Sequence, residues 1–105
     1  PPRSTLFPYT TLFRSMKPEK RTEVVEKLKK HTNSGGLHVI NVFVEKPFIK
    51  NLEKEHSHLW KSGELFMHYH DWKIHTMEEF VFDCNSGGVA HQHCMDVMIA
   101  EMWNE

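Results

Sequence analysis

Histidine is the residue type with which this 105-residue chain could most readily do chemistry, since the chain contains nine of them. Six form three pairs of the pattern His-x-His: His56/His58, His68/His70 and His91/His93. A zinc ion prefers imidazole and thiolate ligands, and two imidazoles can share one ion when they point to the same side of the chain. A thiol, that of Cys94, directly follows the last pair.

Secondary structure decides which of these pairs could share a ligand. On a strand, residues i and i+2 point to the same face, whereas on a helix they point about 200° apart. The pair His68/His70 falls in a predicted helix and the pair at 56 and 58 in a predicted loop, which leaves His91/His93. A tetrahedral zinc site needs further ligands. Scattered surface and turn histidines are therefore the simpler interpretation, and we assign no metal ligands from the sequence.

Other motifs of known chemistry are missing from the sequence. It contains no Cys-x-x-Cys, glycine-rich phosphate loop, nucleophile elbow or His-Glu-x-x-His. A formal net charge of −1 gives no basic surplus for nucleic acid, and no apolar run approaches membrane-spanning length. The thiols of Cys84 and Cys94 suit a reducing cytosol better than a disulfide scaffold, although they could pair across the turn between them. We expect a cytoplasmic protein with no nucleic-acid or membrane partner.

Residues 1–15 differ in composition from everything after Met16. The segment PPRSTLFPYTTLFRS has three prolines, two copies of Thr-Leu-Phe and no acidic residue. It fits neither a secretory signal nor a mitochondrial presequence. All of it resembles the conceptual translation of a common short-read sequencing adapter. We therefore interpret residues 1–15 as an artefact that packs against nothing specific, and residues 16–105 as the natural sequence, with the parent gene cut near Met16.

Two elements are clear in the first half of the chain. Residues 17–32 predict an amphipathic helix, because Val24, Val25 and Leu28 form a narrow apolar stripe among charged residues. The segment LHVINVFV at 37–44 predicts a strand with apolar residues on both faces, as in the middle of a parallel α/β sheet. Such a strand needs cover on both faces, and one helix cannot provide it. The chain is therefore expected to be part of a larger α/β domain.

The second half predicts one short helix and two further segments. In SGELFMHYH, Ser62 is a candidate N-cap. One face of this helix carries its apolar residues: Leu65, Phe66 and Tyr69. Residues 72–82 alternate as in a strand. The segment 94–102 is ambiguous, and local propensity alone favours helix by a small margin.

The order of these segments is similar to the carboxyl-terminal portion of tellurite-resistance-type methyltransferases. These are S-adenosylmethionine-dependent enzymes of the Rossmann-like class, and the resemblance covers residues 17–102. It rests on two pieces of sequence: Gly35-Gly36 before the buried strand, and Gly63-Glu64-Leu65 with Tyr69 and Trp72. The first is common to many methyltransferases, and the second narrows the family.

The resemblance implies an α/β fold class, namely the C-terminal part of a Rossmann-like methyltransferase sheet. Residues 37–44 would be strand 5, residues 72–82 strand 6 and residues 94–102 an antiparallel strand 7 lying between them, with the helix at 17–32 before strand 5. This assignment replaces the marginal preference for helix at the end of the chain. Strand 5 would then lack its neighbour, strand 4. We therefore expect the fragment to self-associate through the edge of strand 37–44.

By the same resemblance, the parent enzyme would transfer a methyl group from S-adenosylmethionine to a small soft nucleophile, such as tellurite, another chalcogen oxyanion or a thiol. The family holds its cofactor through a glycine-rich turn after strand 1 and an acidic residue at the end of strand 2. This sequence contains neither, so we assign no cofactor-binding residue and expect the fragment alone to bind no cofactor and to be inactive. The hairpin at 84–93 would help to shape the acceptor side. Its His91 and His93 are candidate substrate-side residues, and no catalytic residue is carried over.

A rival interpretation comes from a different class of protein. Residues 16–105 could form a small His-rich metal-binding or interaction module, complete at about 90 residues. An upstream reading frame with a glycine-rich turn would support the methyltransferase fragment. A stop codon just before Met16 would support the complete module.

Overall fold

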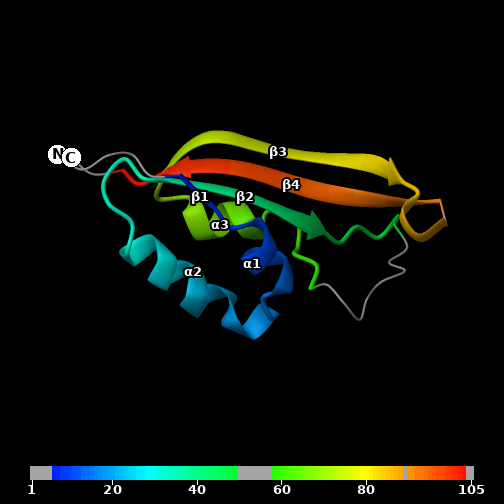
Figure 1. The fold of residues 1–105 in the computed structure, drawn as a ribbon, viewed down its shortest axis with the longest axis horizontal. Coiled ribbons are helices and arrows are strands. Elements are labelled where there is room, and N and C mark those ends of the chain that lie inside the picture. Colours follow the sequence, from blue (N-terminus) through cyan, green and yellow to red (C-terminus); the bar gives the residue numbers. More distant parts are fainter. Residues whose placement is uncertain (1–5, 50–57, 89, 104–105) are drawn as a thin grey trace.

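The structure is a computed structural model that describes residues 6–49, 58–88 and 90–103. Its elements follow in the order β1 (Leu6–Pro8), α1 (Thr10–Ser15), the 3-10 turn η1 (Pro18–Lys20), α2 (Arg21–Lys30), β2 (Leu37–Val44), α3 (Glu64–Tyr69), β3 (Lys73–Cys84), the turn η2 (Ser86–Gly88) and β4 (His91–Glu101). Figure 1 shows the strands in one sheet, with the helices gathered on one of its sides. Among the described residues, no helix is both long and apolar enough to cross a membrane.

The sheet has the strand order β1-β2-β4-β3. Strand β1 runs parallel to β2, whereas β4 lies between β2 and β3 and is antiparallel to both. This is the arrangement predicted for strands 5, 7 and 6, and the predicted α/β fold class is confirmed. The local preference for helix at 94–102 is overridden by tertiary packing. As a strand, β4 buries alternate side chains, from Cys94 to Ala100, between the sheet and the helices.

Strand β2 has the predicted bounds, but only one of its faces is buried. His38, Ile40, Val42 and Val44 point toward the helices and are almost inaccessible, while the alternate residues are half-buried. The expectation that this chain cannot cover both faces of the strand agrees with the structure, because the described helices all lie on the same side of the sheet. Apolar side chains remain on the open face.

Helix α2 lies beneath the sheet and contacts α3 through two buried side chains, since the Lys29 ammonium donates to the His68 carbonyl at 2.6 Å and Arg21 binds Glu64. The guanidinium of Arg21 donates two hydrogen bonds to the Glu64 carboxylate, at 3.0 and 2.9 Å. It also lies 4.2 Å from the ring centroid of Trp60. Of the predicted apolar stripe, Val25 is fully buried, and Val24 and Leu28 pack against the same core. The predicted helix is thus confirmed over Arg21–Lys30.

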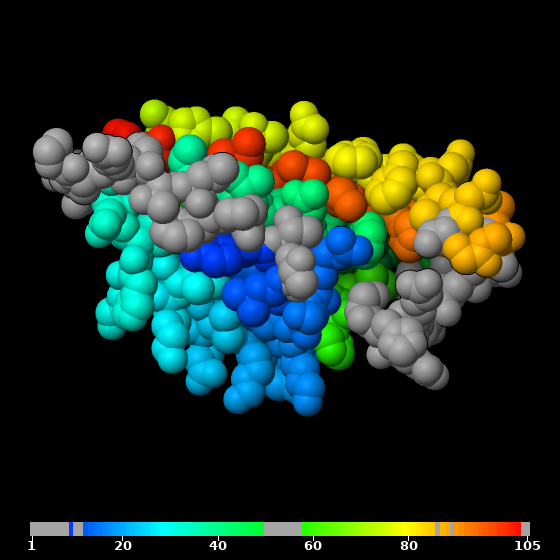
Figure 2. Space-filling view, in the orientation of Figure 1, coloured from blue at the N-terminus to red at the C-terminus, as the bar shows by residue number. Residues whose placement is uncertain are grey.

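Residues 6–15 pack against the rest of the protein, so the expectation that residues 1–15 contact nothing specific is wrong for this part. Strand β1 pairs with the first three residues of β2. The ring of Phe13 is fully buried and stacks on Trp60 at 5.7 Å, and its carbonyl accepts a hydrogen bond from the Trp60 indole at 3.1 Å. Figure 2 shows blue residues of α1 seated beside α2 and against the sheet. The likeness to a sequencing adapter stays a prediction about the origin of the segment.

The same packing changes the expected free edge of β2. Strand β1 covers Leu37–Val39, and the Tyr9 amide donates to the Val39 carbonyl at 3.0 Å. At the other end, the Trp60 amide donates to the Phe43 carbonyl at 2.9 Å. The edge is therefore partly covered, and self-association through it stays a prediction.

Helix α3 differs in detail from its prediction. Its N-cap is Gly63, with a φ of 85°, and the expectation that Ser62 caps it is wrong. The Ser62 hydroxyl instead donates to Glu79 of β3 at 2.9 Å. Leu65 and Tyr69 are fully buried as predicted, but Phe66 remains 40% exposed, because a short helix on the sheet buries only a narrow stripe.

Candidate functional site

The hairpin formed by β3 and β4 extends past the end of β2. The last residue of β2, Val44, pairs with Cys94, whereas the pairing of β3 with β4 continues to Cys84 and His91. The turn between them contains Gly87 and Gly88, whose φ angles of 77° and 78° suit glycine. The two candidate histidines therefore lie on strand β4 itself, and the turn is shorter than the predicted hairpin at 84–93.

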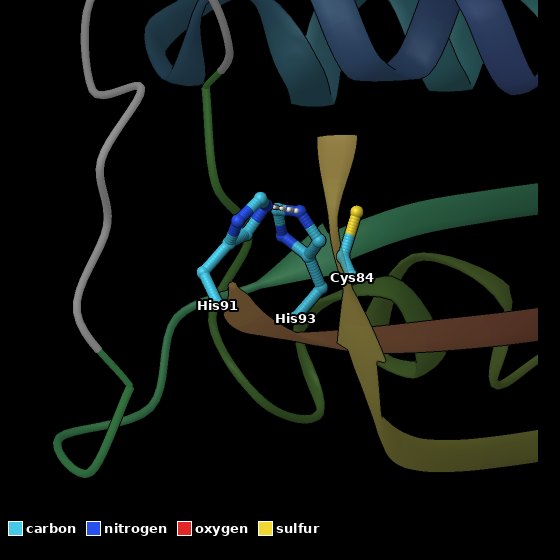
Figure 3. Close-up of side chains that lie close together, drawn as sticks. All are labelled: Cys84, His91 and His93. Carbon is cyan, nitrogen blue, oxygen red and sulfur yellow. Dashed lines mark hydrogen bonds between the residues drawn. The ribbon is translucent and has the colours of Figure 1, made fainter. Parts of the chain in front are cut away.

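Three side chains converge on one face of this hairpin. Cys84 and His91 are directly opposite each other in the antiparallel pairing, and His93 follows two residues later on the same face. The Cys84 Sγ and one ring nitrogen from each histidine all lie within 4.8 Å of one another. The two Nε2 atoms are 3.0 Å apart and share a hydrogen bond (Figure 3). All three side chains are half-buried.

Aromatic rings flank this cluster where the hairpin joins the rest of the sheet. The Phe43 ring stacks on His93 with centroids 4.6 Å apart and an interplanar angle of 18°, and Phe82 lies 5.6 Å from the same imidazole. On the Phe43 ring lies the Arg14 guanidinium, 4.2 Å from the centroid. These contacts restrict the orientation of the His93 ring and shield it from water on that side.

The end of the hairpin also borders an open cleft of about 540 Å³. Its lining consists of six residues: Asp83, Cys84, Asn85, Ala90, His91 and Gln92. The cluster is therefore shielded near Phe43 and accessible near Cys84 and His91. A small ligand could enter from the cleft and meet a thiol and two imidazoles.

The structure brings His91 and His93 together, as the sequence predicts for a pair on a strand. Cys94, their neighbour in sequence, points to the opposite face, where burial raises the pKa of its thiol. The third member of the cluster is Cys84, which sequence reasoning missed. The signal that could have revealed it is the hairpin register, since a tight turn between two strands places Cys84 opposite His91. Both cysteines are free, so the possible pairing between them does not occur.

The other two histidine pairs do not form such a cluster in the described part of the chain. His68 lies within α3 against the edge of Trp60, where burial lowers its pKa, whereas His70 is exposed. The predicted helix thus separates these two rings. His56 lies outside the described residues.

A second polar group, unmarked in the sequence, lies on the helix-facing side of the sheet. Asp96 of β4 is fully buried and lies opposite Glu79 of β3. Burial, reinforced by the Glu79 carboxyl beside it, raises the pKa of Asp96 to about 7. Glu79 itself pairs with the Lys46 ammonium at 2.7 Å. The Asp96 carboxyl is therefore largely protonated below neutral pH.

Comparison with known proteins gives a likeness of fold. No family model matches the chain, and no curated protein matches it in sequence. Among solved structures, the crystal structure of TehB from Haemophilus influenzae superposes with a TM-score of 0.78. The superposition covers 96% of this chain at 19% sequence identity. It covers 37% of the TehB chain, so this chain spans little more than a third of that protein.

Proposed function

We propose that this chain is the carboxyl-terminal part of an S-adenosylmethionine-dependent methyltransferase whose complete form methylates a small soft nucleophile, such as a chalcogen oxyanion or a thiol. The observation that carries the proposal is the sheet: β4 lies antiparallel between β2 and β3, and this arrangement superposes on TehB, a tellurite-resistance methyltransferase, with a TM-score of 0.78. The family resemblance of residues 17–102 supports the same assignment.

The open face of the sheet supports a larger parent protein. It carries apolar side chains from all three long strands, six of them half-buried and Phe80 exposed: Val39, Phe43, Phe80, Phe82, Met95, Val97 and Ile99. A sheet of this class normally has helices on both faces. The rest of the parent would supply the missing layer, together with the glycine-rich turn and the acidic residue that this sequence lacks.

The hairpin cluster has the position expected of an acceptor site. In open α/β sheets, ligands bind outside the carboxyl ends of the parallel strands. Strand β2 ends at Val44, and His91 and His93 lie just past that end. An imidazole N–H can donate a hydrogen bond to an oxyanion and hold it in place. In the complete protein the cofactor would supply the methyl group.

The residues of this chain would contribute orientation and exclusion of water. Methyl transfer is an in-line displacement that depends on proximity and a dry site more than on acid–base groups. The Phe43 ring provides an apolar wall beside His93, and the histidines provide polar contacts for the acceptor. No catalytic acid or base is needed for this role, and we assign none.

The proposal can be tested with a chimera in which residues 16–105 replace the equivalent part of TehB. We expect the chimera to methylate selenite, tellurite or a small thiol, measured as methylated product by gas chromatography. His91→Gln and His93→Gln should raise the KM for the acceptor, whereas His70→Gln, a change at an exposed histidine outside the hairpin, should not. A folded chimera without transfer would overturn the proposal.

The isolated chain provides a second test. Because no cofactor-binding turn is present, titration calorimetry should show no S-adenosylmethionine binding tighter than about 10 μM. Tighter binding would contradict the assignment of the cofactor site to another part of the parent.

A further inference from the structure

We propose that Cys84, His91 and His93 form a binding site for a thiophilic divalent cation of the zinc class, with the fourth coordination position open to the cleft. The proposal departs from the sequence-based expectation of no metal ligands. It rests on the hairpin cluster alone, and it holds or fails independently of the methyltransferase assignment.

The register of the hairpin places the ligands without distortion of the backbone. Cys84 and His91 are opposite residues in an antiparallel pair, whose Cβ atoms are typically about 5 Å apart. Around a tetrahedral zinc ion, bond lengths of about 2.3 Å to sulfur and 2.0–2.1 Å to nitrogen place the ligand atoms roughly 3.3 to 3.6 Å from one another. The Nε2 atoms of His91 and His93 are already 3.0 Å apart. Side-chain rotation of Cys84 within the 4.8 Å spread is enough to complete the site.

The hydrogen bond between the two imidazoles is what a metal ion would replace. It requires Nε2 to carry the proton on one ring and a lone pair on the other. Coordination needs a lone pair on both, so the proton of the donor ring moves to Nδ1, while the Cys84 thiol releases its proton to solvent. The cation thus occupies the position of the shared proton, both imidazoles stay neutral, and binding releases one proton, that of the Cys84 thiol.

The surroundings of the cluster distinguish it from scattered surface histidines. The Phe43 and Phe82 rings restrict the orientation of the His93 imidazole, and a ligand held in its bound orientation loses less freedom on binding. Within the residues that the structure describes, this is the one group of three or more His, Cys, Asp or Glu side chains close enough to hold an ion.

The ligand types indicate which cations fit. One thiolate and two imidazoles suit zinc and other borderline or soft metals, whereas magnesium and calcium prefer oxygen ligands. Three protein ligands with an open position leave room for water or another small ligand from the cleft. Zinc is therefore the cation with which to test the site, and cobalt is its spectroscopic substitute.

Binding can be measured on the full chain after treatment with a chelator. With Co²⁺ we expect one equivalent to bind and to give visible bands of a tetrahedral site, together with a thiolate-to-metal band in the near ultraviolet. Zinc should displace the cobalt with a dissociation constant below about 1 μM. Absence of saturable one-to-one binding at about 100 μM metal would overturn the proposal.

Variants assign the binding to this cluster. Cys84→Ser should abolish the thiolate-to-metal band, and His91→Gln and His93→Gln should each weaken zinc binding at least about tenfold. The matched controls are Cys94→Ala, which removes the thiol on the opposite face, and His70→Gln. If Cys84→Ser, His91→Gln and His93→Gln all bind as tightly as the unchanged chain, the ion lies elsewhere and the proposal is wrong.

A measurement on the unsubstituted chain covers the case in which a variant fails to fold. Zinc should slow alkylation of Cys84 by iodoacetamide at least about tenfold, because the coordinated thiolate is no longer free to react. The position of labelling is read by peptide mass spectrometry as the labelled fraction of the peptide that contains Cys84, and the buried Cys94 should stay unlabelled in both samples. Equal labelling of Cys84 with and without zinc would contradict the site.

Discussion

The Tyr69 hydroxyl lies 2.7 Å from Nδ1 of His38, and both side chains are completely buried. On the other side of the imidazole, Nε2 lies 2.8 Å from the Thr32 hydroxyl, whose own proton is donated to the Leu28 carbonyl at 2.7 Å. Thr32 must therefore accept from Nε2–H, which makes Nδ1 the acceptor of the Tyr69 proton. This chain of hydrogen bonds fixes His38 as a neutral imidazole in one tautomer.

His38 should make the protein less stable in mild acid. Burial, with a smaller contribution from the nearby Lys29 charge, lowers the pKa of His38 to about 4. The unfolded chain binds the proton near the ordinary histidine value of about 6.5, so stability is lost as the pH falls from there to about 4. The loss should reach about 3 kcal/mol. Urea unfolding of the unchanged chain and of His38→Gln between pH 7.5 and 4.5 measures it, and an equal pH dependence in both would contradict it.

Asp96 should have the opposite pH dependence. Because its pKa is raised to about 7 in the folded state, the folded chain holds this proton while the unfolded chain releases it near pH 4. Stability from this group is therefore present at low pH and lost as the pH rises through 7. Asp96→Asn should remove the dependence and raise the free energy of unfolding at pH 8 by about 2 kcal/mol.

Glu79→Gln provides the companion to that measurement. It removes the negative charge facing Asp96 while leaving the Asp96 carboxyl in place, so the folded-state pKa of Asp96 should fall. The loss of stability should then be smaller and complete at a lower pH, because the folded-state pKa sets where the decline ends. The measured quantity is the pH at which the urea midpoint stops declining. A midpoint of Asp96→Asn that declines with rising pH as steeply as that of the unchanged chain would show that another group is responsible.

The amino-terminal segment should contribute measurably to stability. Phe13 is fully buried against Trp60, and its replacement by Ala should cost about 3 kcal/mol through lost contact and a cavity. Deletion of residues 1–15 should cost more than about 2 kcal/mol. Leu12→Ala, at a side chain that is 41% exposed in the same helix, should change stability by less than about 1 kcal/mol. Thermal and urea unfolding provide the measurement, and an unaffected deletion variant would show that the segment does not pack.

The open face of the sheet should promote association of this chain with itself. Phe80 is 42% exposed and lies 5.9 Å from Phe82 on that face, so the two rings form part of an apolar surface. Phe80→Lys should shift the chain from oligomer to monomer at micromolar concentration in sedimentation velocity. Phe66→Lys, at a similarly exposed ring on α3, should leave the oligomer unchanged. If Phe80→Lys associates as strongly as the unchanged chain, the contact lies elsewhere, with the uncovered middle of the β2 edge as the next candidate.

Much of the sheet could be predicted because its strands carry their own pattern. The apolar run at Leu37–Val44 and the alternation of apolar and polar residues within Lys73–Cys84 are both typical of strands. Strand β4 is harder to predict, since its methionines and alanine favour helix locally. Its position between two other strands determines that it forms a strand. That the chain cannot cover both faces of β2 follows from its small number of helices, whereas the choice of the covered face depends on where the helices lie, which local sequence does not encode.

The candidate site could be predicted only in part from the sequence, for a similar reason. His91 and His93 share a face by virtue of strand periodicity, which is local. Cys84 joins them through the register of a hairpin, which depends on the length and geometry of the turn. Asp96 could not be recognised either, because a lone acidic residue in a strand pattern shows nothing about the Glu79 carboxylate opposite it.

The projection of the hairpin beyond Val44 gives this protein a region that can evolve separately from its fold. Residues past the Cys94 pairing have no partner in β2, so side chains facing the cleft, such as those of Cys84 and His91, can be exchanged with little loss of core packing. Mutations there have little effect on stability, and selection acts on them mainly through ligand binding. Related chains with the same sheet are therefore expected to diverge most in ligand preference at this tip.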